Sequence, residues 1–261
     1  MMNRLTRVSI GMFAAALLLP VARVSAQTTS TAKEVHNIVL VHGAFADGSS
    51  WSKVITLLQA KGYNVVAVQN PLSSLADDVA ATKRAIALQQ GPVLLVGHSW
   101  AGMVISEAGN DPKVVGLVYI SALVPQKGQT AGNTANGYPP APGLAEAKPD
   151  AGGWLSLTRK GVDEDFVPEL PAAERAVVYA TQGPWNAKAL AEKVLDPAWA
   201  SKPTWCIVDA NDRMIQPQYE RDSAKRIHAT TIELTAGHVP MLSMPSRVAD
   251  VIVDAATKAG K

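Results

Sequence analysis

Short apolar runs rich in β-branched residues alternate along the chain with amphipathic stretches at helical spacing. The runs are 38–41, 65–68, 93–96, 114–120 and 206–208. Continuous apolar runs of this length are typical of parallel strands that are covered on both faces. Strands that alternate with helices indicate βαβ units with right-handed crossovers. The alternation therefore predicts an α/β fold with a mostly parallel central sheet and helices on both faces.

The amphipathic stretches predict helices over 51–60, 75–88 and 103–108. Each follows one of the apolar runs and carries apolar residues at spacings of three and four. The first stretch comes directly after Ser49 and Ser50, and either serine could cap the start of that helix.

The alternation stops after Leu123 and resumes at Pro203, and the interval is rich in proline and glycine. A long insertion in a compact domain is usually a lid or a binding element, although a purely structural excursion is the alternative. The pattern predicts an α/β core formed by residues 27–124 and 201–261, with residues 125–200 inserted as a helical cap.

The first 26 residues have the three-part pattern of a secretory signal. Arg4 and Arg7 precede the apolar run 8–21, and the small residues Val24-Ser25-Ala26 follow it. The run is shorter than the roughly 20 residues that span a bilayer, so a cleaved signal is favoured over a membrane anchor. We therefore expect cleavage after Ala26, a periplasmic or secreted protein and no stable membrane association.

The charge balance gives no reason to expect a nucleic-acid partner. The chain has 24 Lys and Arg residues against 22 Asp and Glu residues. Three of the arginines and none of the acids lie in residues 1–26, which leaves 21 − 22 = −1 for the rest. A near-neutral protein lacks the basic footprint of a nucleic-acid-binding domain.

The segment 93–104 carries the strongest catalytic signal. A buried strand runs directly into a helix, and Ser99 lies at the junction in Gly97-His98-Ser99-Trp100-Ala101-Gly102. A nucleophile elbow needs small residues around its serine because the turn is tight. The pattern departs from Gly-x-Ser-x-Gly at Ala101, which is the smallest replacement for glycine. The alternative is a serine that only caps the helix.

A second N–H donor to an oxyanion is expected from the loop after the first strand. In this architecture one donor is the residue after the nucleophile, here Trp100, and the other comes from such a loop. The loop contains His42-Gly43-Ala44-Phe45. Ala44 is the predicted second donor and Phe45 the alternative, while His42 is interpreted as a residue that holds the loop.

The other two triad members are predicted from the last two strands. His238 follows the strand-like run 230–234 and can take up and return the serine proton. Asp212 and Asp209 both follow the run 206–208, and Asp212 is preferred as the acid that orients the histidine. The order Ser99, Asp212, His238 is the chain order of α/β-hydrolases.

Four motifs together resemble the α/β-hydrolase superfamily, and within it the small serine esterases related to plant methyl esterases and hydroxynitrile lyases. They are Val-His-Gly-Ala-Phe at 41–45, Gly-His-Ser-Trp-Ala-Gly at 97–102, Asn-Asp-Arg-Met-Ile at 211–215 and Gly-His-Val-Pro-Met at 237–241. The resemblance implies the same catalytic triad and oxyanion donors. The cyanohydrin-cleaving members carry a lysine after the catalytic histidine, whereas this chain has Val239.

The function predicted in this way is cleavage of small, apolar or aryl carboxylic esters through an acyl-enzyme. No metal or organic cofactor is expected, because no Cys/His cluster has ligand spacing and no Gly-rich phosphate loop is present. The candidate substrate-binding residues are Phe45, Trp154, Phe166, Trp185 and Met241. The partner is a small-molecule ester, and the sequence leaves the oligomeric state open. The alternatives are a non-catalytic ligand-binding protein on a hydrolase scaffold, or a lactonase, amidase or perhydrolase with the same triad.

Overall fold

The structure is a computed structural model that describes residues 35–260, so the predicted signal at 1–26 lies outside the described residues. Its centre is a six-stranded sheet in the order β2-β1-β3-β4-β8-β9, in which every neighbouring pair is parallel. This confirms the predicted parallel sheet. The strands are β1 (Asn37–Val41), β2 (Asn64–Val68), β3 (Val93–His98), β4 (Val114–Ile120), β8 (Thr204–Asp209) and β9 (Thr230–Leu234).

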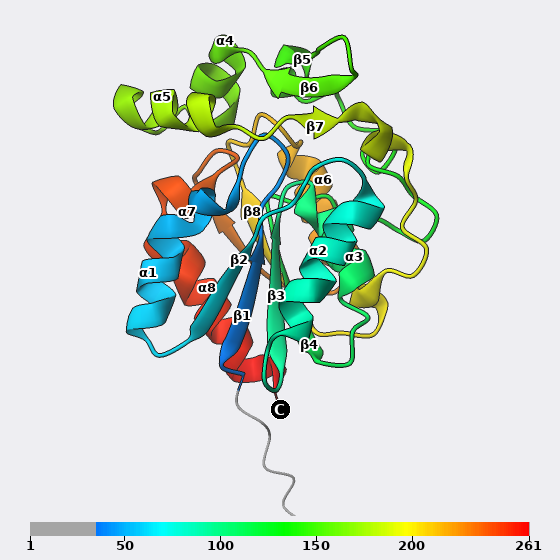
Figure 1. Ribbon diagram of the computed structural model, residues 1–261, viewed down its shortest axis with the longest axis vertical. Coiled ribbons are helices and arrows are strands. Elements are labelled where there is room, and N and C mark those ends of the chain that lie inside the picture. Colours follow the sequence, from blue (N-terminus) through cyan, green and yellow to red (C-terminus); the bar gives the residue numbers. More distant parts are fainter. Residues whose placement is uncertain (1–34, 261) are drawn as a thin grey trace, which may run out of the picture. The chain divides into compact units, whose positions relative to one another are not determined.

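Helices cover both faces of the sheet. In Figure 1, α1 and α8 lie on one side of the strands, and α2 and α3 lie on the other. Every residue of the central strands β1 and β3 is buried between these layers, as expected for strands that contain the apolar runs 38–41 and 93–96. No helix within residues 35–260 combines the length and the apolar character needed to cross a membrane. The helices of the core are α1 (Ser52–Ala60), α2 (Leu75–Ala87), α3 (Ala101–Ala108), α6 (Pro217–Arg226), α7 (Pro240–Ser243) and α8 (Pro245–Ala259).

The start of α1 differs from the sequence expectation. A 3₁₀ turn, η1 (Gly48–Trp51), precedes the helix, so Ser49 and Ser50 lie inside the turn rather than before it. The cap is Asp47, whose Oδ1 accepts a hydrogen bond from the Ser49 N–H at 2.7 Å. The proposed serine cap was therefore wrong, because the helical turn begins earlier than the apolar periodicity does.

The chain between β4 and β8 forms a cap at the carboxyl ends of the strands (Figure 1). The cap is helical only in part, because it also contains the three-stranded antiparallel sheet β5-β6-β7. The turn into β6 is set by Asp150, whose Oδ1 accepts hydrogen bonds from the backbone of Gly152 and Trp154. Its elements are η2 (Pro142–Glu146), β5 (Ala147–Pro149), β6 (Trp154–Leu157), α4 (Arg159–Gly161), the π-helical turn η3 (Val162–Phe166), α5 (Ala172–Thr181), β7 (Trp185–Asn186), η4 (Ala187–Ala191) and η5 (Ala198–Ala200).

Two ion pairs tie the cap to the core. Lys53 on α1 lies 2.7 Å from Glu174 on α5, and Arg213 lies 2.6 Å from Asp165 in η3. Asp165 is buried, whereas the other three side chains are exposed to solvent, so the Arg213–Asp165 pair is the less screened of the two. These contacts place the cap over the end of the sheet where the predicted site residues lie.

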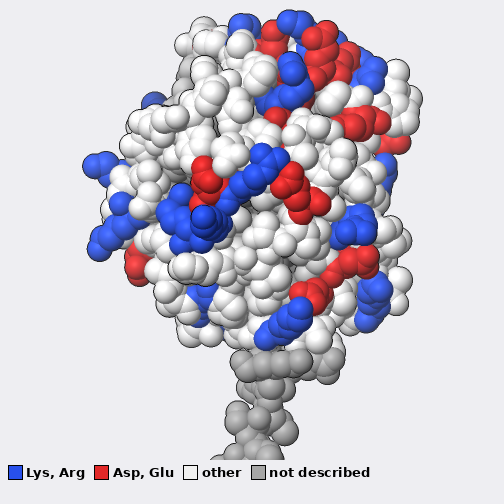
Figure 2. All heavy atoms as spheres, turned by 180° about the vertical axis from the view of Figure 1, so that it is seen from behind, with Lys and Arg blue, Asp and Glu red and all other residues white. Residues whose placement is uncertain are grey.

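The described surface carries charges of both signs. Figure 2 shows basic and acidic side chains interspersed on the face opposite the view of Figure 1, with uncharged areas between them. Opposite charges on the described surface also form exposed pairs, among them Arg221 with Glu233 and Lys258 with Asp254. A mixed surface of this kind creates no strong field of one sign over that face.

Gly102 takes the place of the second glycine of the motif Gly-x-Ser-x-Gly, whose own position is occupied by Ala101. A Cβ at this position would overlap the carbonyl oxygen of Leu123, whereas Ala101 is accommodated in the core without exposure. The small residue that the turn requires on its helical side is therefore residue 102, one position after the place that the motif gives it.

We expect Gly102→Ala to destabilise the protein, which urea denaturation would measure as a lower midpoint. Alanine is favoured over glycine in a helix by about 1 kcal/mol, but overpacking against fixed backbone costs about 1–3 kcal/mol. The exposed helical substitution Gln59→Ala serves as the control and should leave the midpoint nearly unchanged. A variant that is as stable as the wild type, or more so, would contradict the close approach to Leu123.

Candidate active site

Ser99 lies in a strained turn between β3 and α3. Its φ angle is +54°, a left-handed value that non-glycine residues seldom adopt. Three backbone hydrogen bonds hold the turn: the Ser99 N–H donates to Ile120, and the Ser99 carbonyl accepts from Gly102 and Leu123. The side chain is partly exposed although the residues on either side are buried. The turn thus holds the hydroxyl away from the core, as a nucleophile elbow does.

The loop after β1 approaches this turn closely. A Cβ on Gly43 would lie 2.7 Å from Ser99 Cβ and 3.1 Å from His98 Nδ1, so only glycine fits there. His42 braces the same loop, because its Nε2 accepts from the Asn70 N–H at 2.9 Å and its Nδ1–H donates to the Gly43 carbonyl at 2.8 Å. Burial lowers the pKa of His42, which favours this neutral form. These hydrogen bonds agree with the interpretation of His42 as a residue that holds the loop.

The structure brings the three predicted triad residues together. His238 Nε2 lies 2.9 Å from Ser99 Oγ, and His238 Nδ1 lies 2.6 Å from Asp212 Oδ2. With the Nδ1–H donated to the carboxylate, Nε2 is left to accept the serine proton. Both His238 and Asp212 are almost completely buried, so water competes little for these contacts.

A second histidine positions the backbone of His238. His98 Nε2–H donates to the His238 carbonyl at 2.8 Å. Complete burial, and next the nearby His238, hold the pKa of His98 well below its ordinary value, so this imidazole is neutral. The role of His98 was not predicted, because its partner lies 140 residues away and no local pattern marks such a contact.

The structure separates the two aspartates that follow β8. Asp212 Oδ1 accepts from the N–H groups of Met214 and Ile215 at 2.6 and 2.8 Å, which leaves Oδ2 facing the histidine. Asp209 instead accepts a hydrogen bond from the Ser121 hydroxyl, and burial raises the pKa of Asp209 to about 8. Burial also raises the pKa of the neighbouring Glu220 well above its ordinary value. At neutral pH Asp209 is therefore largely uncharged.

A cavity of about 400 Å³ opens over Ser99 and His238. Both predicted oxyanion donors, Ala44 and Trp100, line it, and so does Phe45. None of its described lining residues is an Asp, Glu, Lys or Arg. The remaining lining residues come from the cap and the loop after Asp212: Leu123, Ala131, Gly132, Ala135, Asn136, Gly137, Tyr138, Pro139, Pro140, Ala141, Leu144, Trp185, Leu190, Met214, Ile215 and Gln216.

The structure places the five candidate substrate-binding residues differently. Phe45 and Trp185 line the cavity over Ser99, and their rings meet edge to face at 6.0 Å. The other three candidates, Trp154, Phe166 and Met241, are not among the residues that line this cavity. Trp154 is in β6, the centroid of the Phe166 ring lies 5.5 Å from that of the His238 ring, and Met241 is fully buried in α7.

Several lining residues were missed by the sequence analysis. Tyr138 and Leu144 lie in the proline-rich part of the cap, and Met214 and Ile215 lie two and three residues after Asp212. Proximity to Asp212 was the available signal for the last two. The first two had no signal beyond their position in the insertion.

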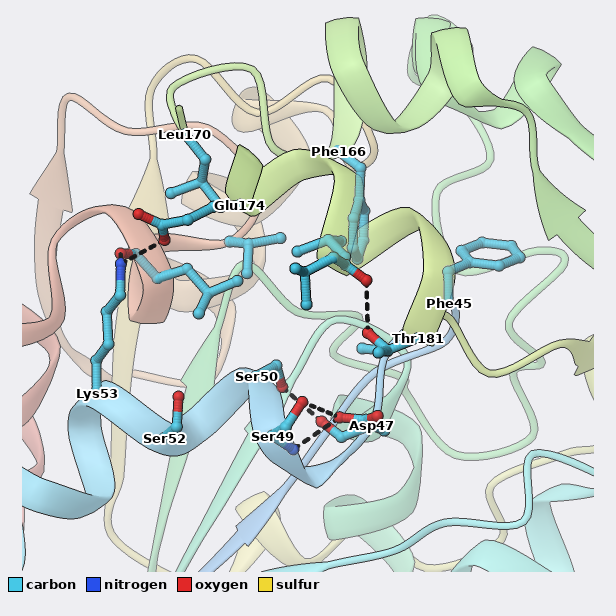
Figure 3. Close-up of a pocket in the computed structure, with 15 residues that line it drawn as sticks. Phe45, Asp47, Ser49, Ser50, Ser52, Lys53, Phe166, Leu170, Glu174 and Thr181 are labelled. Carbon is cyan, nitrogen blue, oxygen red and sulfur yellow. Dashed lines mark hydrogen bonds and ion pairs between the residues drawn. The ribbon is translucent and has the colours of Figure 1, made fainter. Parts of the chain in front are cut away.

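A second cavity, of about 310 Å³, lies between α1 and the cap helix α5. Figure 3 shows Lys53 reaching from α1 to Glu174 at its rim, with Phe166 and Leu170 on the cap side. Phe45 lines both cavities, but Ser99 and His238 line only the first. The reacting groups therefore face the 400 Å³ cavity.

Residues 35–260 contain no group of three or more His, Cys, Asp or Glu side chains that could hold a metal ion. The single cysteine, Cys206, is buried in β8, and burial raises the pKa of its thiol. A thiol in that state is a poor nucleophile.

Residues 38–251 match the model of the alpha/beta hydrolase family. The chain therefore belongs to the alpha/beta hydrolase family, as the sequence resemblance indicated. One relative is a pyrethroid hydrolase of Sphingobium wenxiniae, which is 28% identical in an alignment that covers 84% of this chain and 87% of that protein. Another is an alpha-hydroxynitrile lyase of Arabidopsis thaliana, which is 25% identical in an alignment that covers 85% of this chain and 97% of that protein. Among solved structures, polyneuridine aldehyde esterase matches with a TM-score of 0.74 at 19% identity, covering 84% of this chain and 98% of that one. The protein is a hydrolase of this family.

The raised pKa of Asp209 predicts a pH-dependent stability. The folded carboxyl keeps its proton until about pH 8, whereas the unfolded one loses it near 3.8, so the folded state binds more protons between these values. The free energy of unfolding therefore falls as the pH rises through this window, by at most about 1.4 kcal/mol per unit from this group.

Asp209→Asn should remove that part of the fall. Urea denaturation of both proteins from pH 4 to pH 8 should show the variant gaining stability relative to the wild type as the pH rises. Parallel curves for the two proteins would show that Asp209 titrates normally in the folded state.

Proposed function

We propose that the protein is a serine esterase that cleaves small, neutral, apolar carboxylic esters. The observation that carries the proposal is the hydrogen-bonded series Ser99–His238–Asp212 beneath a cavity in which residues 35–260 place no Asp, Glu, Lys or Arg. The relative named pyrethroid hydrolase and the structural neighbour named polyneuridine aldehyde esterase support ester cleavage on this fold.

In the first chemical step, Ser99 Oγ attacks the ester carbonyl carbon while His238 Nε2 takes the hydroxyl proton. The Nδ1–H···Asp212 hydrogen bond keeps the imidazole in the required tautomer and stabilises the imidazolium. His238 then gives its proton to the departing alcohol, which leaves an acyl-Ser99 ester. Water, activated by the same imidazole, releases the carboxylic acid and restores Ser99.

The oxyanion of each tetrahedral intermediate needs two donors. We assign them to the backbone N–H groups of Trp100, at the start of α3, and of Ala44, in the loop that Gly43 brings against the serine; the Phe45 N–H is the alternative to Ala44. The first turn of a helix favours developing negative charge. Loss of one such donor lowers kcat by about 10²–10³-fold in comparable enzymes.

The cavity walls indicate the substrate class. A substrate with a formal charge in the cavity would have no ionic partner there, and an unpaired buried charge costs several kcal/mol. A volume of about 400 Å³ accommodates a small ester with an alkyl or aryl group. A neutral, apolar ester therefore fits this site better than a charged one.

The test measures ester cleavage by the full chain and its variants. The wild type should hydrolyse 4-nitrophenyl hexanoate, Ser99→Ala should lower kcat by about 10⁵-fold or more, and Asp212→Asn by about 10⁴-fold. Asp209→Asn is the matched control, because it changes a neighbouring buried acid outside the triad. Negligible turnover by the wild type on esters, lactones and amides alike would instead favour a non-catalytic binding protein on this scaffold.

A matched substrate tests the class. The mono-4-nitrophenyl ester of hexanedioic acid carries a carboxylate in place of the terminal methyl of the hexanoate. Its kcat/KM should be lower than that of the hexanoate by about 100-fold or a larger factor, because the described walls of the cavity offer the carboxylate no basic side chain of Lys or Arg. Equal values for the two esters would contradict a neutral substrate. If the enzyme hydrolyses lactones or amides, or forms peracids, faster than it hydrolyses any ester, the same triad would instead be assigned to that reaction.

We also propose that residues 1–26 direct export to the periplasm or the medium and are removed there. The support is the residue pattern of this segment, in which Arg4 and Arg7 precede the apolar run 8–21 and the small residue Ala26 is the last residue of the segment. The intact mass of the exported protein should correspond to a chain that begins at Gln27. Recovery of the uncleaved chain in the cytoplasm would contradict this proposal.

A further inference from the structure

Asp78 on α2 is a fully buried carboxylate next to the residue that follows the nucleophile. Its Oδ2 accepts a hydrogen bond from the Trp100 indole Nε1–H at 2.7 Å. Its Oδ1 accepts from the Leu72 N–H at 2.8 Å. Trp100 and Leu72 are themselves almost completely buried, so both hydrogen bonds are shielded from water. Each carboxylate oxygen thus fixes a different element of the site's surroundings.

The indole that Asp78 holds is part of the cavity wall. Trp100 packs against Trp185 with ring centroids 5.0 Å apart, and Trp185 meets Phe45 edge to face at 6.0 Å. All three residues line the cavity above Ser99. A shift of the Trp100 indole would therefore change the width of the cavity beside the serine.

The second oxygen of Asp78 holds a contact with the cap. Leu72 has a φ of +56°, a strained value for a leucine, and its own carbonyl accepts from the Asn186 N–H at 2.9 Å. Asn186 belongs to β7, as does Trp185. Asp78 thus positions the two sides of the same aromatic contact, Trp100 directly and Trp185 through Leu72.

We infer that Asp78 is a positioning residue that fixes the aromatic wall of the cavity and thereby makes the enzyme discriminate between esters by their width. The inference rests on the proposed esterase function. Asp78 touches neither the substrate nor the reacting atoms; it acts through the Trp100 indole. The wall made by Phe45, Trp100 and Trp185 is the part of the site that sets the selectivity.

The arrangement requires Asp78 as a carboxylate, because only then do both oxygens accept. Burial, and to a smaller extent Asp77 on the same helix and Glu192 of the cap, raise the pKa of Asp78 to about 6, against the hydrogen bonds from Trp100 and Leu72. Below that pH one oxygen gains a proton, which makes it a donor facing an N–H group and weakens its hydrogen bond. Discrimination by width should therefore weaken as the pH falls below 6.

The experiment compares esters of equal carbon number and different width on the full chain. One pair varies the acyl group, 4-nitrophenyl hexanoate against 4-nitrophenyl 3,3-dimethylbutanoate. The other varies the alcohol, hexyl acetate against 3,3-dimethylbutyl acetate. The measured quantity is the narrow-to-wide ratio of kcat/KM, in which the ionisation of the shared triad cancels. Small size differences in an apolar pocket change kcat/KM by about 10–200-fold.

Asp78→Asn keeps the size of the side chain but turns one acceptor into a donor. At pH 7.5 it should lower the narrow-to-wide ratio at least about fivefold in one of the two pairs. Trp100→Phe, which removes the indole N–H, should lower the same ratio, and the double variant should add little to either single change. Thr82→Ala, one turn further along α2 at a buried hydroxyl without a hydrogen-bond partner among the described residues, is the matched control for loss of packing.

Each outcome decides the inference. It is supported if Asp78→Asn lowers one ratio by that factor while Thr82→Ala does not. A wild-type ratio that falls below pH 6, while that of Asp78→Asn stays flat, supports the need for an ionised carboxylate, and a flat wild-type ratio overturns that need. It is overturned if both ratios stay within about fivefold of wild type in Asp78→Asn, or if Thr82→Ala changes them equally. Should Asp78→Asn fail to fold, the Trp100→Phe ratio and the wild-type pH profile decide in the same way. Ester cleavage that survives in Ser99→Ala would overturn the proposed function instead, so the two failures are distinguishable.

Discussion

The strained turn at Ser99 determines how the rest of the site can be built. A φ of +54° at this residue is held by hydrogen bonds from Gly102 and Leu123 to its carbonyl, and the helix beyond it can pack only because residue 102 has no side chain. Gly43 provides a similar close approach from the other side. The backbone strain is thus maintained by tight packing on both sides, which is the condition under which such conformations persist in proteins.

Around this turn, burial divides neighbouring ionisable groups into different roles. Asp212 and Asp209 are three residues apart, yet one faces His238 and the other bonds to Ser121 with a raised pKa. The neighbouring imidazoles differ in the same way, because His98 is neutral and holds the His238 backbone while His238 contacts the serine. Hydrogen-bond partners and the local environment, rather than residue type, therefore separate the groups that can do chemistry from those that hold them in place.

The sequence was sufficient for features whose signal is local. Five of the six strands could be predicted because they are continuous apolar runs, and the sixth, β9, only as a strand-like run before His238. Ser99 could be located because a strand, small residues and a helix follow one another within 12 positions. The antiparallel sheet of the cap was missed because its strands are only two to four residues long. Asp78 and His98 were missed because the residues that they hold beside the site, Trp100 and His238, lie 22 and 140 residues away along the chain. Cavity walls assembled from distant loops have no periodicity that a sequence analysis could detect.

The most direct measurement is the site of covalent labelling by a neutral organophosphonate. Such a reagent phosphonylates a serine only where a base and an oxyanion hole activate it. One equivalent should attach to Ser99, located by mass spectrometry of the peptide that contains it, and esterase activity should be lost in proportion to the labelling. Attachment at another residue, or full activity in a protein labelled at Ser99, would contradict the role assigned to this serine.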